Sequence, residues 1–312
     1  MGTEKYTIVV PVYYNEGCLR PTFESFRREI FDANPGWTPE VIFVDDGSGD
    51  GSLKEALEIR AENPQTVKVI KLTRNYGQVF ALIAGFSHAK GECVIAISAD
   101  QQDPASVVSD MLRAYFNEKY EIVIAARKGR DESFYRVATS RFFYWLMRKF
   151  CFSNMPVGGF DLVLLGPRAK QAFLREKDPH PFFQGKILST GYRTKFLSYR
   201  RKERKTGKSR WTFAKKLTFL IDGLLSYSYA PIRFMSIAGG IIALLGFSYA
   251  GIVLVNRTFY GNPVKGWAPL MIVILVLSGF QMLMIGVIGE YLWRTLAQVR
   301  DRDQYLIDEV YE

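Results

Sequence analysis

Two long apolar stretches that contain no charged residue restrict this chain more than any other feature. They cover residues 234–255 and 267–289, which are 22 and 23 residues long. A helix of about 20 apolar residues crosses the hydrocarbon core of a bilayer, where only helices and closed barrels satisfy every backbone polar group. We therefore predict a two-helix transmembrane hairpin over residues 231–293. Two core helices of a soluble protein are the alternative, which the length and the lack of charge disfavour.

Positive charge gathers on the N-terminal side of this hairpin. The net charge is +10, and residues 193–216 hold eleven Lys or Arg against one acid, Glu203. Basic segments bind nucleic acid or anionic membranes, and the apolar stretches that follow favour the membrane. The loop 256–266 carries only Arg257 and Lys265. The positive-inside rule then predicts that the N-terminal domain and both termini lie on the cytoplasmic side of the inner membrane, with residues 294–312 as a tail.

Two further segments are predicted to lie at the membrane interface. Residues 213–230 place apolar side chains on one helical face, namely Phe213, Leu217, Leu220, Leu224 and Tyr227, a pattern that favours an interfacial helix when Lys and Arg are close by. Residues 127–150 mix basic with aromatic side chains, and Trp and Tyr are typical of membrane interfaces. In this segment Arg136 and Ser140 stand one helical turn apart, so they are candidates to hold a lipid phosphate. A solvated basic face is the alternative for Arg136.

The first 126 residues alternate strand and helix signals. Strands are predicted at 7–12, 41–44, 67–72, 93–97 and 122–125, and helices at 19–31, 52–60, 78–88 and 104–119. Pro104 suits the first turn of the last helix, where its missing N–H costs nothing. This order predicts an α/β fold with a mostly parallel sheet and helices on both faces. We assign it to a single domain, residues 1–212.

Polar turns follow three of these strands, at residues 13–16, 45–48 and 98–100. The carboxyl ends of parallel strands meet in one crevice, which is where open α/β sheets hold their ligands. Asp100 and Gln102 offer oxygen ligands for Mg²⁺ or Mn²⁺, and Asp45 and Asp46 suit hydrogen bonds to a base or ribose. The structural alternatives are a helix cap at Asp100 and a simple Asp-Gly-Ser turn. No GxGxxG or Walker lysine motif occurs.

Five motifs follow one another along the chain, namely Pro11-Val-Tyr-Tyr-Asn-Glu16, Val44-Asp-Asp-Gly-Ser48, Arg74-Asn-Tyr-Gly-Gln78, Asp100-Gln-Gln-Asp-Pro104 and Lys208-Ser-Arg-Trp211. Together they resemble family-2 glycosyltransferases, and most closely the polyprenyl-phosphate glycosyltransferases, the group of dolichol-phosphate mannose synthases and bactoprenol glucosyltransferases. The resemblance covers nearly the whole chain. It implies a GT-A-like (Rossmann-like) fold and a metal-dependent, inverting transfer of sugar from a nucleotide sugar to polyprenyl (undecaprenyl) phosphate, for modification of cell-envelope glycans.

The resemblance also implies roles for individual residues. The nucleotide sugar would contact Pro11, Tyr13, Asn15, Glu16, Asp45, Asp46, Arg74, Gln78, Ser98 and Asp100. The lipid phosphate would contact Arg127, Arg136, Ser140, Lys208 and Arg210. Asp100 and Gln102 would bind Mg²⁺ or Mn²⁺, and Asp100 is also a candidate catalytic residue. UDP-glucose is the expected donor, with UDP-GlcNAc, GDP-mannose and UDP-aminoarabinose as alternatives, and the family suggests a homo-oligomer, a tetramer.

Two positions depart from the family pattern. Ser98 stands where the family usually has the first acid of an Asp-x-Asp motif. The resemblance places the metal on the second acid and the glutamine, both of which this chain keeps. Gly159 stands where many members have a carboxylate that is sometimes proposed as a base, and Asp161 is the candidate catalytic substitute.

Three other functions compete with this interpretation. A processive polysaccharide synthase would share the nucleotide-binding half, but Gly207 stands where the Gln-x-x-Arg-Trp signature has its glutamine. A non-catalytic membrane partner subunit is suggested by Ser98 alone. A nucleic-acid-binding protein is disfavoured by the acidic crevice and the apolar spans, so we expect no nucleic acid among the partners.

Overall fold

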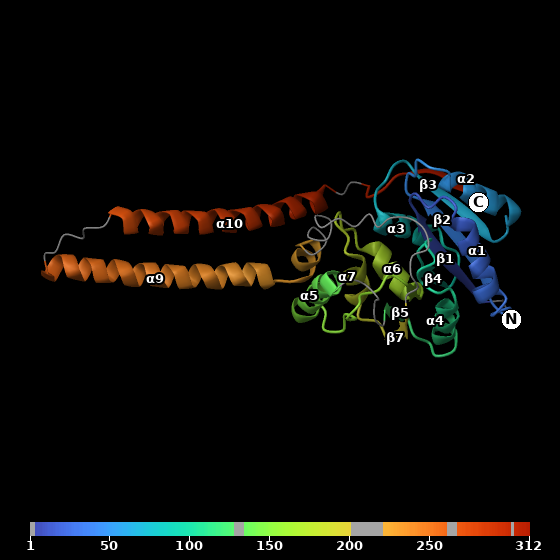
Figure 1. The fold of residues 1–312 in the computed structure, drawn as a ribbon, viewed down its shortest axis with the longest axis horizontal. Coiled ribbons are helices and arrows are strands. Elements are labelled where there is room, and N and C mark those ends of the chain that lie inside the picture. The colour runs from blue at the N-terminus through green and yellow to red at the C-terminus, as the bar shows by residue number, and fades with distance from the viewer. Residues whose placement is uncertain (1–3, 128–133, 201–220, 261–266, 301–302) are drawn as a thin grey trace. The chain divides into compact units, whose positions relative to one another are not determined.

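The computed structural model describes residues 4–127, 134–200, 221–260, 267–300 and 303–312. The fold divides into two compact units (Figure 1). One unit comprises Met1–Gly223 together with Arg302–Glu312, and the other comprises Leu224–Asp301. The last eleven residues therefore belong to the first unit, although the second unit precedes them in the sequence.

An eight-stranded sheet forms the centre of the first unit, with the strand order β7-β5-β6-β4-β1-β2-β3-β8. The strands are β1 Lys5–Val12, β2 Thr38–Asp45, β3 Val67–Leu72, β4 Cys93–Ala96, β5 Ile122–Arg127, β6 Val163–Leu165, β7 Thr194–Tyr199 and β8 Ile307–Tyr311. The four neighbours β4, β1, β2 and β3 run parallel, and β5 runs parallel to β7. β6 pairs antiparallel with both β4 and β5, and β8 pairs antiparallel with β3. The expected α/β fold with a mostly parallel sheet is confirmed.

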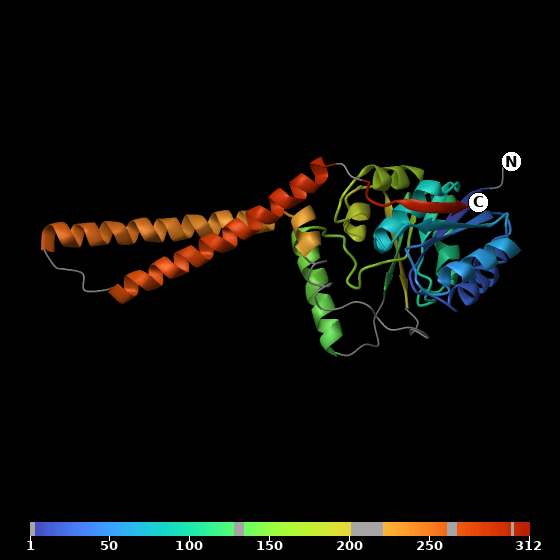
Figure 2. The same cartoon turned by 90° about the horizontal axis from the view of Figure 1, so that it is seen from above.

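Helices cover both faces of this sheet, as Figure 2 shows for the blue and the yellow-green helices. Their bounds are α1 Leu19–Phe26, the π-helix η1 Arg27–Phe31, α2 Ser52–Glu62, α3 Gln78–His88, α4 Ser106–Phe116, α5 Phe134–Phe150, α6 Pro167–Arg175 and α7 Phe183–Leu188. Side chains alternate between the faces of a strand. Ile8 and Val10 of β1 accordingly join the core under α1, α2 and α4, whereas Val9 faces Gly85 of α3. A Cβ on Gly85 would lie 2.2 Å from Val9 Cγ1, so glycine lets α3 pack closely on the sheet.

Several boundaries differ from those predicted. The helix expected over residues 104–119 begins at Ser106 and ends at Phe116. Pro104 therefore lies before its first turn. The strand expected at 93–97 ends at Ala96, and the helix expected over 19–31 becomes α-helix followed by a π-helical turn. The strands β6, β7 and β8 were not predicted. Of the interfacial segment 213–230, residues 213–220 lie outside the described residues, and residues 221–227 are helical.

The second unit contains two long apolar helices, α9 Ala230–Tyr260 and α10 Trp267–Val299. By length and composition, Ala230–Asn256 and Val276–Val299 are each sufficient to cross a membrane. The large apolar side chains of these helices are mostly exposed, for example Phe247 and Phe259, each at 78%. So much apolar surface is unfavourable in water and favourable in lipid. Two membrane-length apolar helices are therefore present, but the second membrane-length stretch covers Val276–Val299 instead of the predicted 267–289.

Candidate functional site

The candidate site is built from the turns that follow β1, β2, β3 and β4. Because these four strands are parallel neighbours, their carboxyl ends lie along the same edge of the sheet. The polar motifs after β1, β2 and β4 were predicted to meet there, and the segment Arg74–Gln78 after β3 joins them. Ligands of open α/β sheets bind at this edge.

The turn after β1 is fastened to the segment that follows β2. The Tyr13 N–H donates to Oδ1 of Asn15 at 2.9 Å, which closes the turn. The Tyr14 N–H then donates to Ser48 Oγ at 3.1 Å, and Glu16 Oε2 accepts from the Gly51 N–H at 3.1 Å. The side chains of Tyr13 and Tyr14 are about one-third or more exposed, and their rings meet edge to face. This turn therefore presents two aromatic rings on a rigid support, while Pro11 lies within β1 itself.

Asp45 and Asp46 are both buried at the end of β2. Asp46 accepts hydrogen bonds from the backbone N–H groups of Tyr76 at 2.7 Å and Gly77 at 2.9 Å, and from Asn75 Nδ2 at 3.1 Å. Burial raises the pKa of Asp46 to about 6, although the backbone hydrogen bonds act in the opposite direction. Asp46 therefore holds the loop after β3 in place.

Asp45 has a different environment from its neighbour. Its Oδ2 accepts from the Ser48 N–H at 3.2 Å, but its buried Oδ1 accepts no hydrogen bond from the described residues. A buried acceptor without a donor costs free energy comparable to a lost hydrogen bond. The arrangement leaves Oδ1 available to an N–H or O–H group of a ligand.

The loop of residues 73–78, which we call the donor loop, is packed directly against the turn after β2. Gly47 has a φ of +71°, and a Cβ at this position would lie 2.6 Å from the backbone carbon of Arg74. The Arg74 guanidinium stacks over the Tyr76 ring, 4.5 Å from its centroid. Gln78 is the first residue of α3, after Gly77 with a φ of +104°. The donor loop thus holds Arg74 and Gln78, two predicted donor-binding residues, against the predicted base-binding turn.

The turn after β4 brings Ser98, Asp100 and Gln102 together. Ser98 Oγ lies 2.8 Å from Asp100 Oδ1 and 3.2 Å from Asp103 Oδ2, and the Gln102 N–H donates to Asp100 Oδ1 at 3.3 Å. Gln101 takes a φ of +55°, which closes this tight turn. The serine hydroxyl, which stands where the family has an acid, therefore bridges two carboxylates.

The side-chain oxygen atoms in this turn are suitable ligands for a hard divalent metal ion. The carboxylate of Asp100 and the amide of Gln102 provide oxygen ligands, which suit Mg²⁺ or Mn²⁺ better than zinc. In the described part of the chain, no three His, Cys, Asp or Glu side chains gather to hold a metal ion. A bound ion would thus take most of its ligands from substrate phosphates and water, as Mg²⁺ usually does.

A buried polar network adjoins the metal candidate, and sequence reasoning did not find all of it. Tyr199 of β7 donates its hydroxyl to Asp103 Oδ1, and the guanidinium of Arg127 is ion-paired with Asp161. Arg127 and Tyr199 are register partners on β5 and β7. The buried Nε of Arg127 donates to none of the described residues. Asp103 carried a signal in the Gln-Asp-Pro motif, whereas nothing in the sequence marks Tyr199.

The remaining predicted lipid-phosphate residues are only partly described. Arg136 and Ser140 lie on α5, one turn apart, and nothing further is described for their side chains. Lys208 and Arg210 lie outside the described residues. Farther along α5, Phe142 and Trp145 stack with ring centroids 6.0 Å apart, and Lys149 Nζ lies 5.1 Å from the Trp145 ring centroid. These aromatic and basic side chains are exposed, as is typical of residues at membrane interfaces.

Comparisons with known proteins agree with this geometry. The family model described as glycosyl transferase family 2 matches residues 7–176. The uncharacterized glycosyltransferase YkcC of Bacillus subtilis (strain 168) is 32% identical, over 98% of this chain and 94% of that protein. The SfII prophage-derived bactoprenol glucosyl transferase of Shigella flexneri is 30% identical, over 97% of each chain.

Among solved structures, the fold is similar to that of the mannosyltransferase PcManGT from Pyrobaculum calidifontis, determined in complex with GDP-Man and Mn²⁺. The TM-score is 0.52 and the identity 17%, over 90% of this chain and 80% of that one. At this level of identity the similarity bears on the fold alone. The matched family model covers more than half of the chain, and the relatives match almost all of it; the chain belongs to glycosyl transferase family 2.

Proposed function

We propose that this glycosyltransferase moves glucose from UDP-glucose to undecaprenyl phosphate at the cytoplasmic face of a membrane, with inversion at the anomeric carbon. One observation carries the proposal: the turns at the carboxyl edge of the sheet and two membrane-length helices occur in the same chain. Such a chain suits one soluble and one membrane-bound substrate. The bactoprenol glucosyl transferase relative supports the sugar and the lipid.

In the donor half of the proposed site, the free Oδ1 of Asp45 accepts a hydrogen bond from the base or ribose. Asp46 fixes the donor loop, so that Arg74 faces the nucleotide from a rigid backbone. Tyr13, Asn15, Glu16, Gln78 and Ser98 complete the proposed donor site. A Mg²⁺ or Mn²⁺ ion held by Asp100 and Gln102 would supply positive charge to the departing diphosphate.

In the acceptor half, Arg127 binds the lipid phosphate with Arg136, Ser140, Lys208 and Arg210. The buried Nε of Arg127 donates to none of the described residues, so it can donate to a phosphate oxygen. Asp161, which pairs with Arg127, is our candidate for a catalytic carboxylate on this side. Charge-assisted hydrogen bonds between arginine and phosphate are among the strongest in proteins.

The reaction is a single displacement. An oxygen of the acceptor phosphate attacks the anomeric carbon while the bond from that carbon to the diphosphate oxygen breaks, which yields a glucosyl monophosphate lipid and UDP. A phosphate monoester has a second pKa of about 6, so the attacking oxygen already carries negative charge at neutral pH. A strong general base is then less important than positioning and charge stabilisation, and Gly159 in place of the family's carboxylate is compatible with catalysis.

For the membrane part, α9 and α10 each cross the bilayer once. Because β8 returns to the sheet of the catalytic unit, the chain must come back to the side from which it left, which an even number of crossings achieves. The segment 256–266 carries only Arg257 and Lys265, and by the positive-inside rule we propose that it lies on the outer side. Both termini and the catalytic unit are then cytoplasmic, with 127–150 and 213–230 at the interface.

A donor screen tests this proposal. Purified full-length protein is incubated with undecaprenyl phosphate, Mn²⁺ and one radiolabelled sugar nucleotide at a time, and the lipid product is isolated. We expect label in the lipid from UDP-glucose, and the opposite anomeric configuration in the product. If only UDP-GlcNAc or only GDP-mannose labelled the lipid, that nucleotide sugar would be the donor instead of UDP-glucose. If no donor labelled the lipid, the protein would more plainly be a non-catalytic membrane partner.

A further inference from the structure

The strand β8, which follows the membrane hairpin in the sequence, closes the sheet beside β3. Its register pairs Val69 with Tyr311 and Leu72 with Ile307. The pairing continues one residue past β3, because the Thr73 N–H donates to the Leu306 carbonyl at 3.1 Å. Thr73 is the first residue of the donor loop. Without β8, β3 would be an exposed edge strand with an unpaired row of backbone groups.

Thr73 connects β8 to the side chains of the donor loop. Its backbone N–H is held by Leu306, and its Oγ1 lies 2.9 Å from the Tyr76 hydroxyl. The Tyr76 ring in turn supports the Arg74 guanidinium. A continuous series of contacts therefore runs from β8 through Thr73 and Tyr76 to Arg74. Asp46 holds the other side of the same loop.

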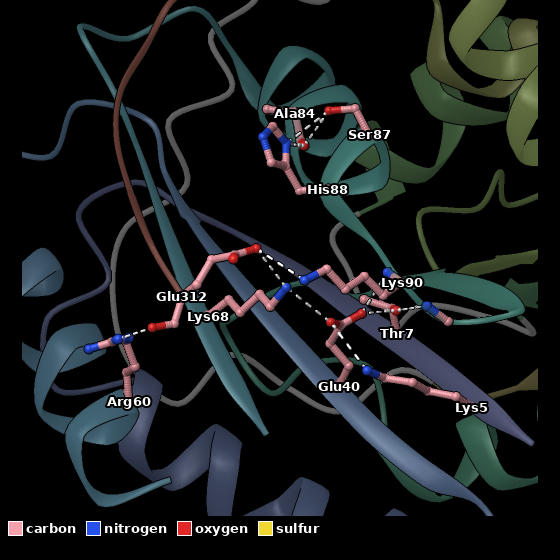
Figure 3. Close-up of polar contacts among 11 residues, drawn as sticks. Lys5, Thr7, Glu40, Arg60, Lys68, Ala84, Ser87, His88, Lys90 and Glu312 are labelled. Carbon is pink, nitrogen blue, oxygen red and sulfur yellow. Dashed lines mark hydrogen bonds and ion pairs between the residues drawn. The ribbon is translucent and has the colours of Figure 1, made fainter. Parts of the chain in front are cut away.

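Charged side chains fix the far end of β8, as Figure 3 shows. Oε1 of Glu312 lies 3.0 Å from Lys68 Nζ and 3.4 Å from Lys90 Nζ. Lys68 also pairs with the buried Glu40 at 3.4 Å, which ties this cluster to β2, and Arg60 donates to the backbone carbonyl of Glu312.

Further contacts hold the strand and the segment before it. Asp308 Oδ2 lies 2.6 Å from Lys71 Nζ across the strand pair. Upstream of β8, Gln304 Nε2 donates to the Asp178 carbonyl at 2.8 Å, and the Tyr305 hydroxyl lies 3.4 Å from Ser87 Oγ of α3. Exposed ion pairs are individually weak, but these contacts act together with the backbone ladder to fix β8 along its whole length.

We propose that β8 is a positioning element of the donor site, so that the nucleotide sugar is bound by a loop ordered by the segment that returns from the membrane hairpin. This inference rests on the proposed function, because it takes the donor loop to contact the nucleotide sugar. Of the proposed lipid-phosphate residues that the structure describes, Arg127 lies on β5 and Arg136 and Ser140 lie on α5, so we expect β8 to affect donor binding and to leave acceptor binding unchanged.

Charge reversal on β8 tests the proposal in the full-length protein. Asp308→Lys combined with Glu312→Lys places positive charge against Lys68, Lys71 and Lys90. We expect the KM for UDP-glucose to rise about threefold to tenfold and the KM for undecaprenyl phosphate to stay within about twofold. Backbone amides of residues 73–77 should exchange hydrogen faster. Adding Lys71→Asp, which restores one pair with reversed polarity, should recover part of the loss.

Asp303→Lys is the control, because it makes one acid-to-lysine reversal of the same kind in the same segment, ahead of the strand. A second variant, Tyr311→Pro, loosens β8 by another route, since Tyr311 pairs with Val69 and proline cannot donate to the ladder. The inference would be overturned if the amides of β8 exchanged hydrogen faster while hydrogen exchange in the donor loop and the KM for UDP-glucose stayed unchanged. Equal increases in both KM values would do the same. A wild-type protein that transfers no glucose would count against the proposed function, while the exchange comparison would still test whether β8 orders the donor loop.

Discussion

Asp46 gives the candidate site a defined dependence on pH. Burial raises its pKa to about 6, well above the value of about 3.9 expected in an unfolded chain. The folded state therefore binds this proton more tightly than the unfolded state. Where the folded state binds more protons, the free energy of unfolding decreases as pH rises.

We predict that the protein loses up to about 3 kcal/mol of stability through this group between about pH 4 and pH 7. Asp46→Asn has no carboxyl to titrate, so its stability should depend less steeply on pH. Denaturant midpoints of both detergent-solubilised proteins across this range provide the measurement. Parallel curves for the variant and the wild type would show that Asp46 does not titrate as described.

Arg136 tests the acceptor half at the level of one side chain. It lies one turn from Ser140 on α5, and a charge-assisted contact with phosphate contributes about 1.5–3 kcal/mol. Arg136→Ala should raise the KM for polyprenyl phosphate, or lower kcat, by about 10- to 150-fold. Binding of the nucleotide sugar, measured by calorimetry with Mn²⁺, should hardly change, and Arg136→Lys should recover part of the loss. If Arg136→Ala instead weakened binding of the nucleotide sugar and left the KM for polyprenyl phosphate unchanged, Arg136 would belong to the donor site.

Among the elements of the site, the turn after β2 packs closely on the donor loop, and we predict that donor binding requires this packing. Gly47 and Gly17 have similar φ angles, +71° and +75°, but a Cβ at Gly17 meets nothing within 4 Å, whereas one at Gly47 overlaps the backbone of Arg74 and Asn75. The left-handed conformation costs either alanine variant about 1–2 kcal/mol. Only Gly47→Ala should also displace the donor loop and raise the KM for UDP-glucose, by about tenfold or more. Equal KM values for Gly47→Ala and Gly17→Ala would contradict this.

The sequence predicted β1 to β5 because each is a compact apolar run between turn signals. It did not predict β6, which has three residues and therefore no readable period. The strand β8 contains Asp308 and Glu309, and its apolar residues are too few to indicate a partner; its pairing with β3 depends on contacts between distant parts of the sequence. Asp100 and Asp103 could be found from the sequence because they stand in a recognisable motif. Tyr199 could not, because its place near the site depends on the pairing of β7 with β5.

For the whole molecule, we propose that the two apolar helices anchor the enzyme in a membrane. Val276 lies near the middle of the span predicted over residues 267–289 and is 65% exposed. Arginine near the centre of a spanning helix costs about 2.5–3.5 kcal/mol on insertion, so Val276→Arg should reduce the fraction of protein that resists alkaline extraction from membranes. Asp303→Arg, beyond the end of α10, should behave as the wild type. Full solubility of the wild-type chain without detergent would refute the membrane hairpin.

Asp100 is the residue on which the proposed metal-dependent transfer from UDP-glucose to undecaprenyl phosphate depends most. The most direct measurement compares the formation of radiolabelled glucosyl lipid by the wild type and by Asp100→Ala, with Mn²⁺ and with a chelator. We expect product from the wild type with Mn²⁺ and little product with the chelator. Asp100→Ala should form at least about a hundredfold less product, and it should still melt and insert as the wild type does. A rate for Asp100→Ala within about tenfold of the wild type, equivalent to about 1.4 kcal/mol of barrier, would contradict it.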